Sequence, residues 1–282
     1  MKQQASNQWG VARLPVAYRG AYKGAHKGAY KGAFLVAALA SLCPAAHAER
    51  TYSVGLAAGA APRYAGSRDY RVVGAPVLRA DFGNGAFIDL LQGAGYTYKF
   101  GNGMFATASL GYALGRTDKN RADLPGSDHL KGMGNIPGSL MGAFQLGARV
   151  YGDTTLSVTL DAPLTHRERG LSGHIDLVVP VIQSGAHIVT LGPSVHYGSG
   201  RYMQTLFGVT DAQAANSAFG QYAPKAGFDA ATLSLAWNYT LSKEWSVRTL
   251  VAATRLLGDA AKSPIVQSKQ SYFGMSSVNY TF

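Results

Sequence analysis

The stretch LSLAWNYTL, from Leu233 to Leu241, alternates strictly between two kinds of side chain. One set of positions carries Leu, Leu, Trp, Tyr and Leu, and the intervening set carries Ser, Ala, Asn and Thr. Successive side chains of a β-strand point to opposite faces. The stretch therefore predicts a strand with one apolar face and one polar or small face.

The same alternation recurs along the chain and predicts twelve strands of about ten residues, separated by Gly, Asp and Asn turns. Beyond residue 48 no apolar run approaches the length of a membrane helix. We expect an all-β fold, a transmembrane antiparallel up-and-down β-barrel; ten strands remain an alternative because one segment is short, and a soluble sandwich would show similar alternation. The expected strands lie near 51-61, 72-82, 86-91, 94-100, 104-114, 138-151, 155-164, 173-182, 187-197, 228-241, 245-257 and 271-282.

Short and long connectors alternate between these strands if a tight turn falls near Gln92 and Gly93. Bacterial barrels have short periplasmic turns and longer outer loops. This pattern predicts that both ends of the barrel sequence lie on the periplasmic side. Pro180 and Pro193 each remove a ladder donor, and we expect a bulge at each.

The first 48 residues read as a secretory signal peptide that is removed. A basic region precedes the apolar run 33–43, and Ala46-His47-Ala48 provides a small-residue cleavage site between Ala48 and Glu49. The domains are thus 1-48, a cleavable signal peptide with a long basic n-region, and 49-282, an outer-membrane barrel. A lipid-modified Cys43 is disfavoured because Leu42 precedes it, where a small residue is needed.

The basic charge of the chain is concentrated in this leader. The whole chain has 26 Lys+Arg and 15 Asp+Glu, but six of the bases and none of the acids precede residue 49, which leaves 20 bases against 15 acids. The aromatic-basic-Gly-Ala repeats of 18–34 suit an over-long n-region, a start codon downstream of Met1, or a nucleic-acid arm. The mild remaining charge argues against a nucleic-acid partner.

The last three outward aromatic or apolar positions, Val278, Tyr280 and Phe282, share one strand face and end the chain. They are similar to the C-terminal signal by which outer-membrane barrels are recognised for insertion. We therefore expect the barrel assembly machinery and outer-membrane lipid as partners, and the cell outer membrane as the location.

The opposite phase of the alternation predicts a set of polar side chains facing the lumen, where water or paired ions tolerate charge. A solute path and a salt-bridge network that plugs a narrow bore are both compatible with them. These candidates are Arg79, Asp81, Lys99, Arg149, Asp161, His174, Asp176, His196, Asn238 and Arg248.

No catalytic, cofactor or metal site is expected. Lipid hydrolysis by a barrel would need Ser and His on the outward face near the outer leaflet. Here His174 and His196 fall on the inward phase, and His166 lies in an outer loop. Asp128 and His129 lack further metal ligands at the required spacing, and the paired glycines open no helix, as a dinucleotide site would require.

Several motifs, in the same order along the chain, resemble the MipA/OmpV family of outer-membrane proteins. They are PRYAGSRDYRVVGAPVLRADF (62–82), LKGMGNI (130–136), YMQTLFGVTDAQAANSAFGQYAPKAG (202–227), RLLGDAAKSPIV (255–266) and the terminal NYTF. The resemblance implies a non-enzymatic barrel that holds a lytic transglycosylase together with a penicillin-binding protein. Other members are porin-like, and the family supplies no catalytic or ligand residues to carry over.

The function hypothesis is an envelope scaffold linking a murein hydrolase and a synthase, with a porin-like channel for small solutes as the alternative and an outer-membrane lipid hydrolase as a distant third. The scaffold hypothesis has one difficulty, which is the small area available to a periplasmic partner. Short periplasmic turns offer little area, whereas a stable interface buries about 800 Å² per partner. A filled bore would favour scaffolding, and an open one transport.

Overall fold

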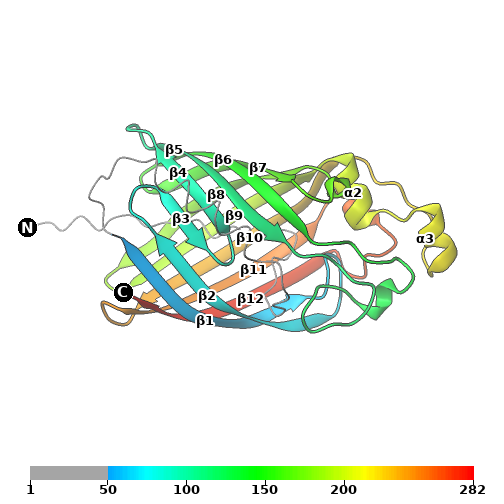
Figure 1. The fold of residues 1–282 in the computed structure, drawn as a ribbon, viewed down its shortest axis with the longest axis horizontal. Coiled ribbons are helices and arrows are strands. Elements are labelled where there is room, and N and C mark those ends of the chain that lie inside the picture. Colours follow the sequence, from blue (N-terminus) through cyan, green and yellow to red (C-terminus); the bar gives the residue numbers. More distant parts are fainter. Residues whose placement is uncertain (1–49) are drawn as a thin grey trace, which may run out of the picture.

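The computed structural model describes residues 50–282, and the expected cleavage site at Ala48 and Glu49 lies outside that range. The described residues contain twelve strands that form one closed barrel (Figure 1). Strand ends agree with the sequence prediction to within two residues. The strands are β1 (Thr51–Pro62), β2 (Tyr70–Asp81), β3 (Ala86–Asp89), β4 (Gly93–Lys99), β5 (Met104–Ala113), β6 (Ser139–Tyr151), β7 (Thr154–Pro163), β8 (Ser172–Ser184), β9 (His187–Gly198), β10 (Gly227–Thr240), β11 (Trp245–Leu256) and β12 (Gln270–Thr281).

Each strand pairs antiparallel with its neighbours in the chain, and β1 closes the barrel on β12 from Ser53↔Thr281 to Ala60↔Gly274. Closure removes most of the unpaired strand edges that a membrane interior does not tolerate. No helix among residues 50–282 is long and apolar enough to cross a membrane. The all-β, twelve-stranded expectation is confirmed.

The barrel wall is incomplete on one side, which we call the side notch. The strand β3 pairs only with Arg79, Ala80 and Asp81 of β2, and the β4 pairing with β5 ends at Ala94↔Leu110. From residue 70 to residue 77, β2 therefore has β1 as its single neighbouring strand within the described part of the chain. The side notch lies between this part of β2 and the last residues of β5.

The turn that ends the short hairpin depends on Gly93. Its φ is 96°, and a Cβ built there would collide with the Leu110 carbonyl oxygen. A positive φ disfavours side-chain-bearing residues. The tight turn predicted near Gln92 and Gly93 is confirmed.

The two expected proline bulges have different outcomes. The β8–β9 register shifts between Pro180 and Ile182, as predicted. At Pro193 the prediction is wrong, because the β9–β10 register runs on through Leu233↔Pro193. Toward β8, the pairs Asp176↔Ser194 and Val179↔Leu191 flank Pro193 and have the same register. The missing donor is accommodated without an extra residue.

The two ends of the barrel differ in their connectors (Figure 1). The turn end carries the short connectors 82–85, 100–103, 152–153, 185–186 and 241–244, together with the C-terminus. The loop end carries 63–69, 114–138, 164–171, 199–226 and 257–269, and we call these five connectors the cap. Within the cap lie the helices α2 (Gly200–Phe207) and α3 (Asp211–Asn216), and the 3-10 turns η2 (Asp128–Leu130), η3 (Arg167–Arg169) and η4 (Ala260–Lys262).

Candidate functional site

The polar wall of the lumen centres on two histidines that stack with their ring centroids 6.4 Å apart. His174 Nδ1 lies 2.5 Å from Asp176 Oδ2, and its Nε2 lies 3.6 Å from Asp161 Oδ2. His196 Nδ1 lies 2.5 Å from Asp229 Oδ1. Both histidines and Asp229 are buried. The structure thus brings four of the sequence candidates together.

Asp229 is the member of this group that sequence reasoning missed. Alternation counted back from Leu233 places residue 229 on the outward face. A register shift between Phe228 and Ala230 turns the carboxylate inward instead, where its Oδ2 is buried without a hydrogen-bond partner. A β-bulge re-aims side chains in this way, and the Gly227-Phe228 strand start gives no signal of it.

A second polar group lies nearer the turn end. Arg79 is 3.5 Å from Asp89 and 3.7 Å from Asp81, with its side chain about a quarter exposed. Asp89 also accepts the backbone N–H groups of Leu91 and Gln92 at 2.8 and 2.9 Å, which fixes the short hairpin. The charges of this group are therefore paired, and the carboxylate of Asp89 was not among the sequence candidates.

Of the remaining lumen candidates, Arg248 interacts electrostatically with Arg79 and Asp89 of the second group, and the other three join neither group. Lys99 is exposed at the turn end, and Arg149 is exposed there and lies 3.9 Å from Asp153. Asn238 and Arg248 face each other across the β10–β11 pairing and are partly exposed. Lys99, Arg149 and Asn238 form no compact site.

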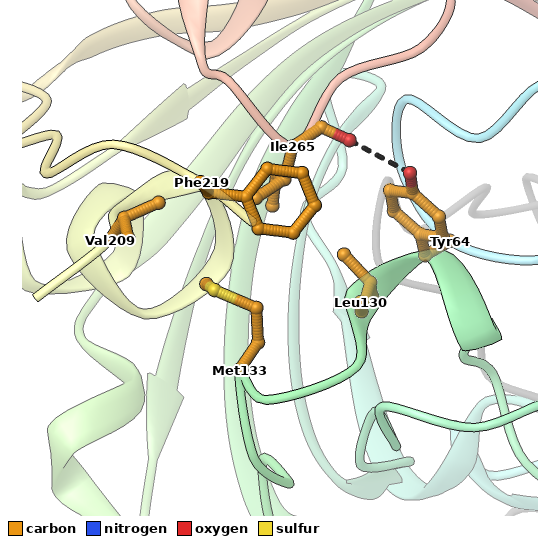
Figure 2. Close-up of a cluster of buried hydrophobic side chains, with 6 residues drawn as sticks. All are labelled: Tyr64, Leu130, Met133, Val209, Phe219 and Ile265. Atoms are coloured by element: carbon orange, nitrogen blue, oxygen red, sulfur yellow. Dashed lines mark hydrogen bonds between the residues drawn. The ribbon is translucent and has the colours of Figure 1, made fainter. Parts of the chain in front are cut away.

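The cap closes on two hydrophobic cores of its own. The first consists of six buried side chains drawn from four connectors, and the Tyr64 hydroxyl there donates to the Ile265 carbonyl at 2.7 Å (Figure 2). In the second core, α2 and η4 pack against the ends of β10 and β11. Members of the first are Tyr64, Leu130, Met133, Val209, Phe219 and Ile265; members of the second are Tyr202, Met203, Phe207, Ala230, Leu256 and Ala260.

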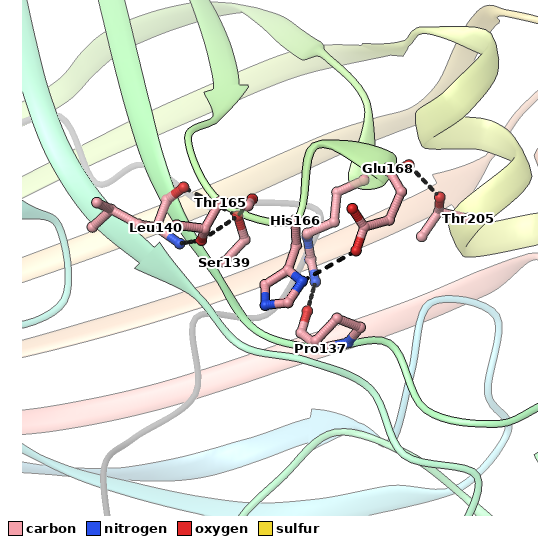
Figure 3. A network of polar contacts seen from close by, with 8 residues as sticks. Pro137, Ser139, Leu140, Thr165, His166, Glu168 and Thr205 are labelled. Atoms are coloured by element: carbon pink, nitrogen blue, oxygen red, sulfur yellow. Dashed lines mark hydrogen bonds and ion pairs between the residues drawn. The ribbon is translucent and has the colours of Figure 1, made fainter.

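Polar contacts tie the connector 164–171 to its neighbours (Figure 3). The Thr205 hydroxyl of α2 donates to the Glu168 carbonyl at 2.7 Å, and Arg169 donates to the Pro137 carbonyl at 2.8 Å. His166 lies on the exposed side of this connector, 3.2 Å from Glu168. Its place in a long connector is as expected, and its side chain contacts a carboxylate there.

Burial under the cap perturbs several ionisable groups. Burial is the main cause that raises the pKa of Tyr64, and the nearby Arg116 opposes that rise. Burial likewise lowers the pKa of Arg116 to about 10, with Tyr64 opposing and Arg169 assisting. The pKa of the Tyr202 phenol is raised, first by burial and then by Asp229. These groups were not among the sequence candidates, because nothing in their local sequence marks them as buried.

The outside of the barrel carries an apolar surface with aromatic residues near the turn end. Val278, Tyr280 and Phe282 point to this face, and the Tyr280 ring lies 4.9 Å from Phe282 and 5.1 Å from Trp245. Exposed Leu, Val and Ile side chains follow toward the loop end. Such a surface, around a polar interior, is the arrangement of a transmembrane barrel.

Within residues 50–282 no group of three or more His, Cys, Asp or Glu is placed to hold a metal ion. The histidine contacts are with carboxylates and aromatic rings. Chemically, the lumen offers paired charges, and the cap offers buried arginines.

Fold and surface together define an outer-membrane β-barrel protein. The particular family follows from comparison with known sequences. A family model described as "MltA-interacting protein MipA" matches residues 54–282, and the chain belongs to the MipA family.

Solved structures with a similar fold include three bacterial outer-membrane proteins. The translocator domain of the autotransporter NalP from Neisseria meningitidis has 12% identity and a TM-score of 0.38, covering 90% of this chain and 95% of its own. The anion-selective porin from Comamonas acidovorans has 13% identity and a TM-score of 0.35, and the match covers 83% of this chain and 99% of the porin chain. The outer membrane protein OprD from Pseudomonas aeruginosa has 12% identity and a TM-score of 0.35, and the match covers 81% of this chain and 65% of the OprD chain. At such low identity and TM-score these likenesses carry no argument about function. No curated protein matches the chain.

Proposed function

We propose that this protein is a non-enzymatic outer-membrane scaffold that binds a lytic transglycosylase of the MltA type and holds it near a penicillin-binding murein synthase. The observation that carries the proposal is the match to the MipA family over nearly the whole barrel, since that family is named for an interaction with MltA. The closed cap adds support, because a barrel roofed by two hydrophobic cores is better suited to holding partners than to free solute flow.

The partner surface in this proposal is the rim of the turn end, which faces the periplasm. Tyr151 at the end of β6 is 84% exposed, and the charged side chains of Lys243 and Glu244 lie on another turn of the same rim. Exposed tyrosines are frequent interface hot spots. An interface of about 800 Å² per partner would need several of the five turns together.

The test is capture of a purified transglycosylase by the immobilised barrel in non-ionic detergent. We expect the unmodified chain to retain the enzyme, and the double variant Tyr151→Ser, Lys243→Glu to lose at least about tenfold in affinity, because a hot-spot residue contributes about 2 kcal/mol or more. Lys262→Glu, an equal charge change in the cap, should bind like the unmodified chain. Failure of the unmodified chain to retain the enzyme would refute the scaffold.

The channel alternative is favoured by one feature, the charges of Arg79 and Asp81 in the lumen near the turn end, whose side chains are each about a quarter exposed. A solute path needs such a wet, charged lining. Planar-bilayer recordings separate the two proposals. Reproducible open-channel steps from purified protein would contradict a pure scaffold, and a silent bilayer would contradict the channel.

A further inference from the structure

Two cap arginines are buried without a carboxylate partner. Arg116 and Arg169 are 8% and 6% exposed. Arg116 donates to the Leu206 carbonyl at 2.7 Å, and its Nε is buried without a hydrogen-bond partner. Arg169 donates to the Pro137 carbonyl. The ion pairs among residues 50–282 include neither of them. Buried charges in proteins are normally paired.

The two arginines are held by adjacent residues, because the Arg116 backbone pairs with that of Ile136 at 2.9 and 2.7 Å and the Arg169 side chain donates to the carbonyl of Pro137. Burial lowers the pKa of Arg116 most, the neighbouring Tyr64 raises it, and the positive charge of Arg169 lowers it further. Burial lowers the pKa of Arg169 as well, against opposing effects of Tyr202, Tyr112 and Glu168. Like charges that are buried within reach of each other destabilise the cap unless an anion neutralises them.

Four acids contact histidines and form no ion pair with either arginine. Asp161, Asp176 and Asp229 contact the two lumen histidines. Glu168 has a side chain 61% exposed, and it contacts His166. The hydroxyl of Tyr202, whose pKa responds to the charge of Arg169, is buried without a hydrogen-bond partner. The site therefore combines two guanidinium groups that have no ion-pair partner with a hydroxyl donor that has no acceptor.

We propose that Arg116 and Arg169, with the Tyr202 hydroxyl as a further donor, form a binding site for an oxyanion of the phosphate class beneath the cap. Guanidinium groups present several N–H donors in a plane that suits phosphate oxygens. The anion stabilises the cap by neutralising two buried charges. This site is independent of the scaffold proposal, because it lies at the opposite end of the barrel from the turn rim.

Two sources supply this chemistry: free phosphate and the head group of a phosphorylated amphiphile. In the amphiphile case the head group would enter by way of the side notch, because Arg116 lies three residues beyond the end of β5, which borders that notch. The acyl chain would then remain in the bilayer while the phosphate reaches the arginines. The recognition chemistry is the same for both.

The test uses the full barrel in non-ionic detergent and follows amide hydrogen exchange of the cap segment 199–226 by mass spectrometry. Inorganic phosphate and dodecyl phosphate are titrated separately, with chloride at matched ionic strength as the reference. We expect phosphate-type anions, and not chloride, to slow exchange of the cap in a saturable way. A response to both probes assigns a free-anion site, and a response to dodecyl phosphate alone assigns a head-group site.

Arg116→Met is the decisive variant. It removes one buried charge, so we expect the ligand-free cap to exchange more slowly and the affinity for the anion to fall about tenfold or more. If Arg116 had a purely structural role, Arg116→Met would make the ligand-free cap exchange faster. Arg201→Met removes an exposed charge from α2 and should leave the anion response intact. The site is refuted if neither probe protects the unmodified cap beyond chloride, or if Arg116→Met responds like the unmodified chain.

Discussion

The two ends of this barrel are stabilised by different means. At the turn end, connections of a few residues are held by contacts within the same turn: Asp81 accepts the Gly83 N–H, and Asn84 accepts the Ala86 N–H, both at 3.0 Å. At the loop end, connectors from distant parts of the chain share two hydrophobic cores. Local hydrogen bonds need only neighbouring residues, whereas the cap is stable only if all its segments assemble together. A destabilising substitution should therefore act locally at the turn end, whereas at the loop end it should destabilise the whole cap.

The largest effect is expected from Phe207→Ala. Phe207 is fully buried in the second cap core, so its truncation should cost about 3–5 kcal/mol of cap stability. Hydrogen exchange should accelerate in all the packed connectors. Phe100→Ala, at an exposed phenylalanine near the turn end, should change exchange only in its own hairpin. Unchanged cap exchange in Phe207→Ala would remove the distinction between the two ends.

A matched pair of glycines tests whether the connectors pack tightly. Gly132 and Gly134 both have positive φ, 88° and 73°, but a Cβ on Gly132 would meet the Asn216 carbonyl, whereas Gly134 has open space. We expect Gly134→Ala to cost about 1–2 kcal/mol from backbone strain alone. Gly132→Ala should cost about 1–3 kcal/mol more, through overpacking against α3. Chemical denaturation followed by limited proteolysis of the cap measures both, and equal costs would show that the contact with Asn216 is not tight.

A substitution at Asp89 tests the local stability of the short hairpin formed by β3 and β4. Replacing this carboxylate by Ala removes two backbone hydrogen bonds and the partner of Arg79, and we expect a loss of about 1–3 kcal/mol. The heat needed to unfold the barrel on a detergent gel should fall, while cap exchange stays unchanged. Asp81→Asn, which leaves the hairpin hydrogen bonds in place, serves as the control. Faster cap exchange in Asp89→Ala would contradict the independence of the two ends.

The smallest effect should come from acid acting on His129, which stacks on Tyr64 with ring centroids 6.5 Å apart. Partial burial lowers the pKa of His129 below its ordinary value of 6.5; the charge of Asp69 opposes this shift and that of Arg68 adds to it. Because the folded pKa is the lower one, cap stability is complete above about pH 6.5 and falls as the pH drops through that value. The side chain is exposed, so the loss should be slight. His129→Phe should flatten the exchange of 114–138 between pH 7 and pH 5, and an unchanged slope would assign the acid sensitivity to other groups.

Much of the barrel follows from sequence because strand alternation is a local property. Leu233 to Leu241 predicts both a strand and which of its side chains face outward, and Gly93 marks a turn that only glycine accommodates. The Tyr64 hydroxyl and the Ile265 carbonyl, in contrast, lie 201 residues apart in the chain. No periodicity connects them. The inward turn of Asp229 depends on one register shift, and the burial of Arg116 depends on the cap that closes over it.

The sequence by itself predicted twelve strands, with ten as the alternative, the inward and outward faces of the regular strands, the alternation of short and long connectors, and the resemblance to the MipA/OmpV family. These features depend on residues that are neighbours in the chain. Only the tertiary structure decided that the cap closes on two cores, that the wall is interrupted between β2 and β5, and that two arginines are buried together. Burial and charge pairing arise from contacts between distant segments, which the barrel brings together only on closing.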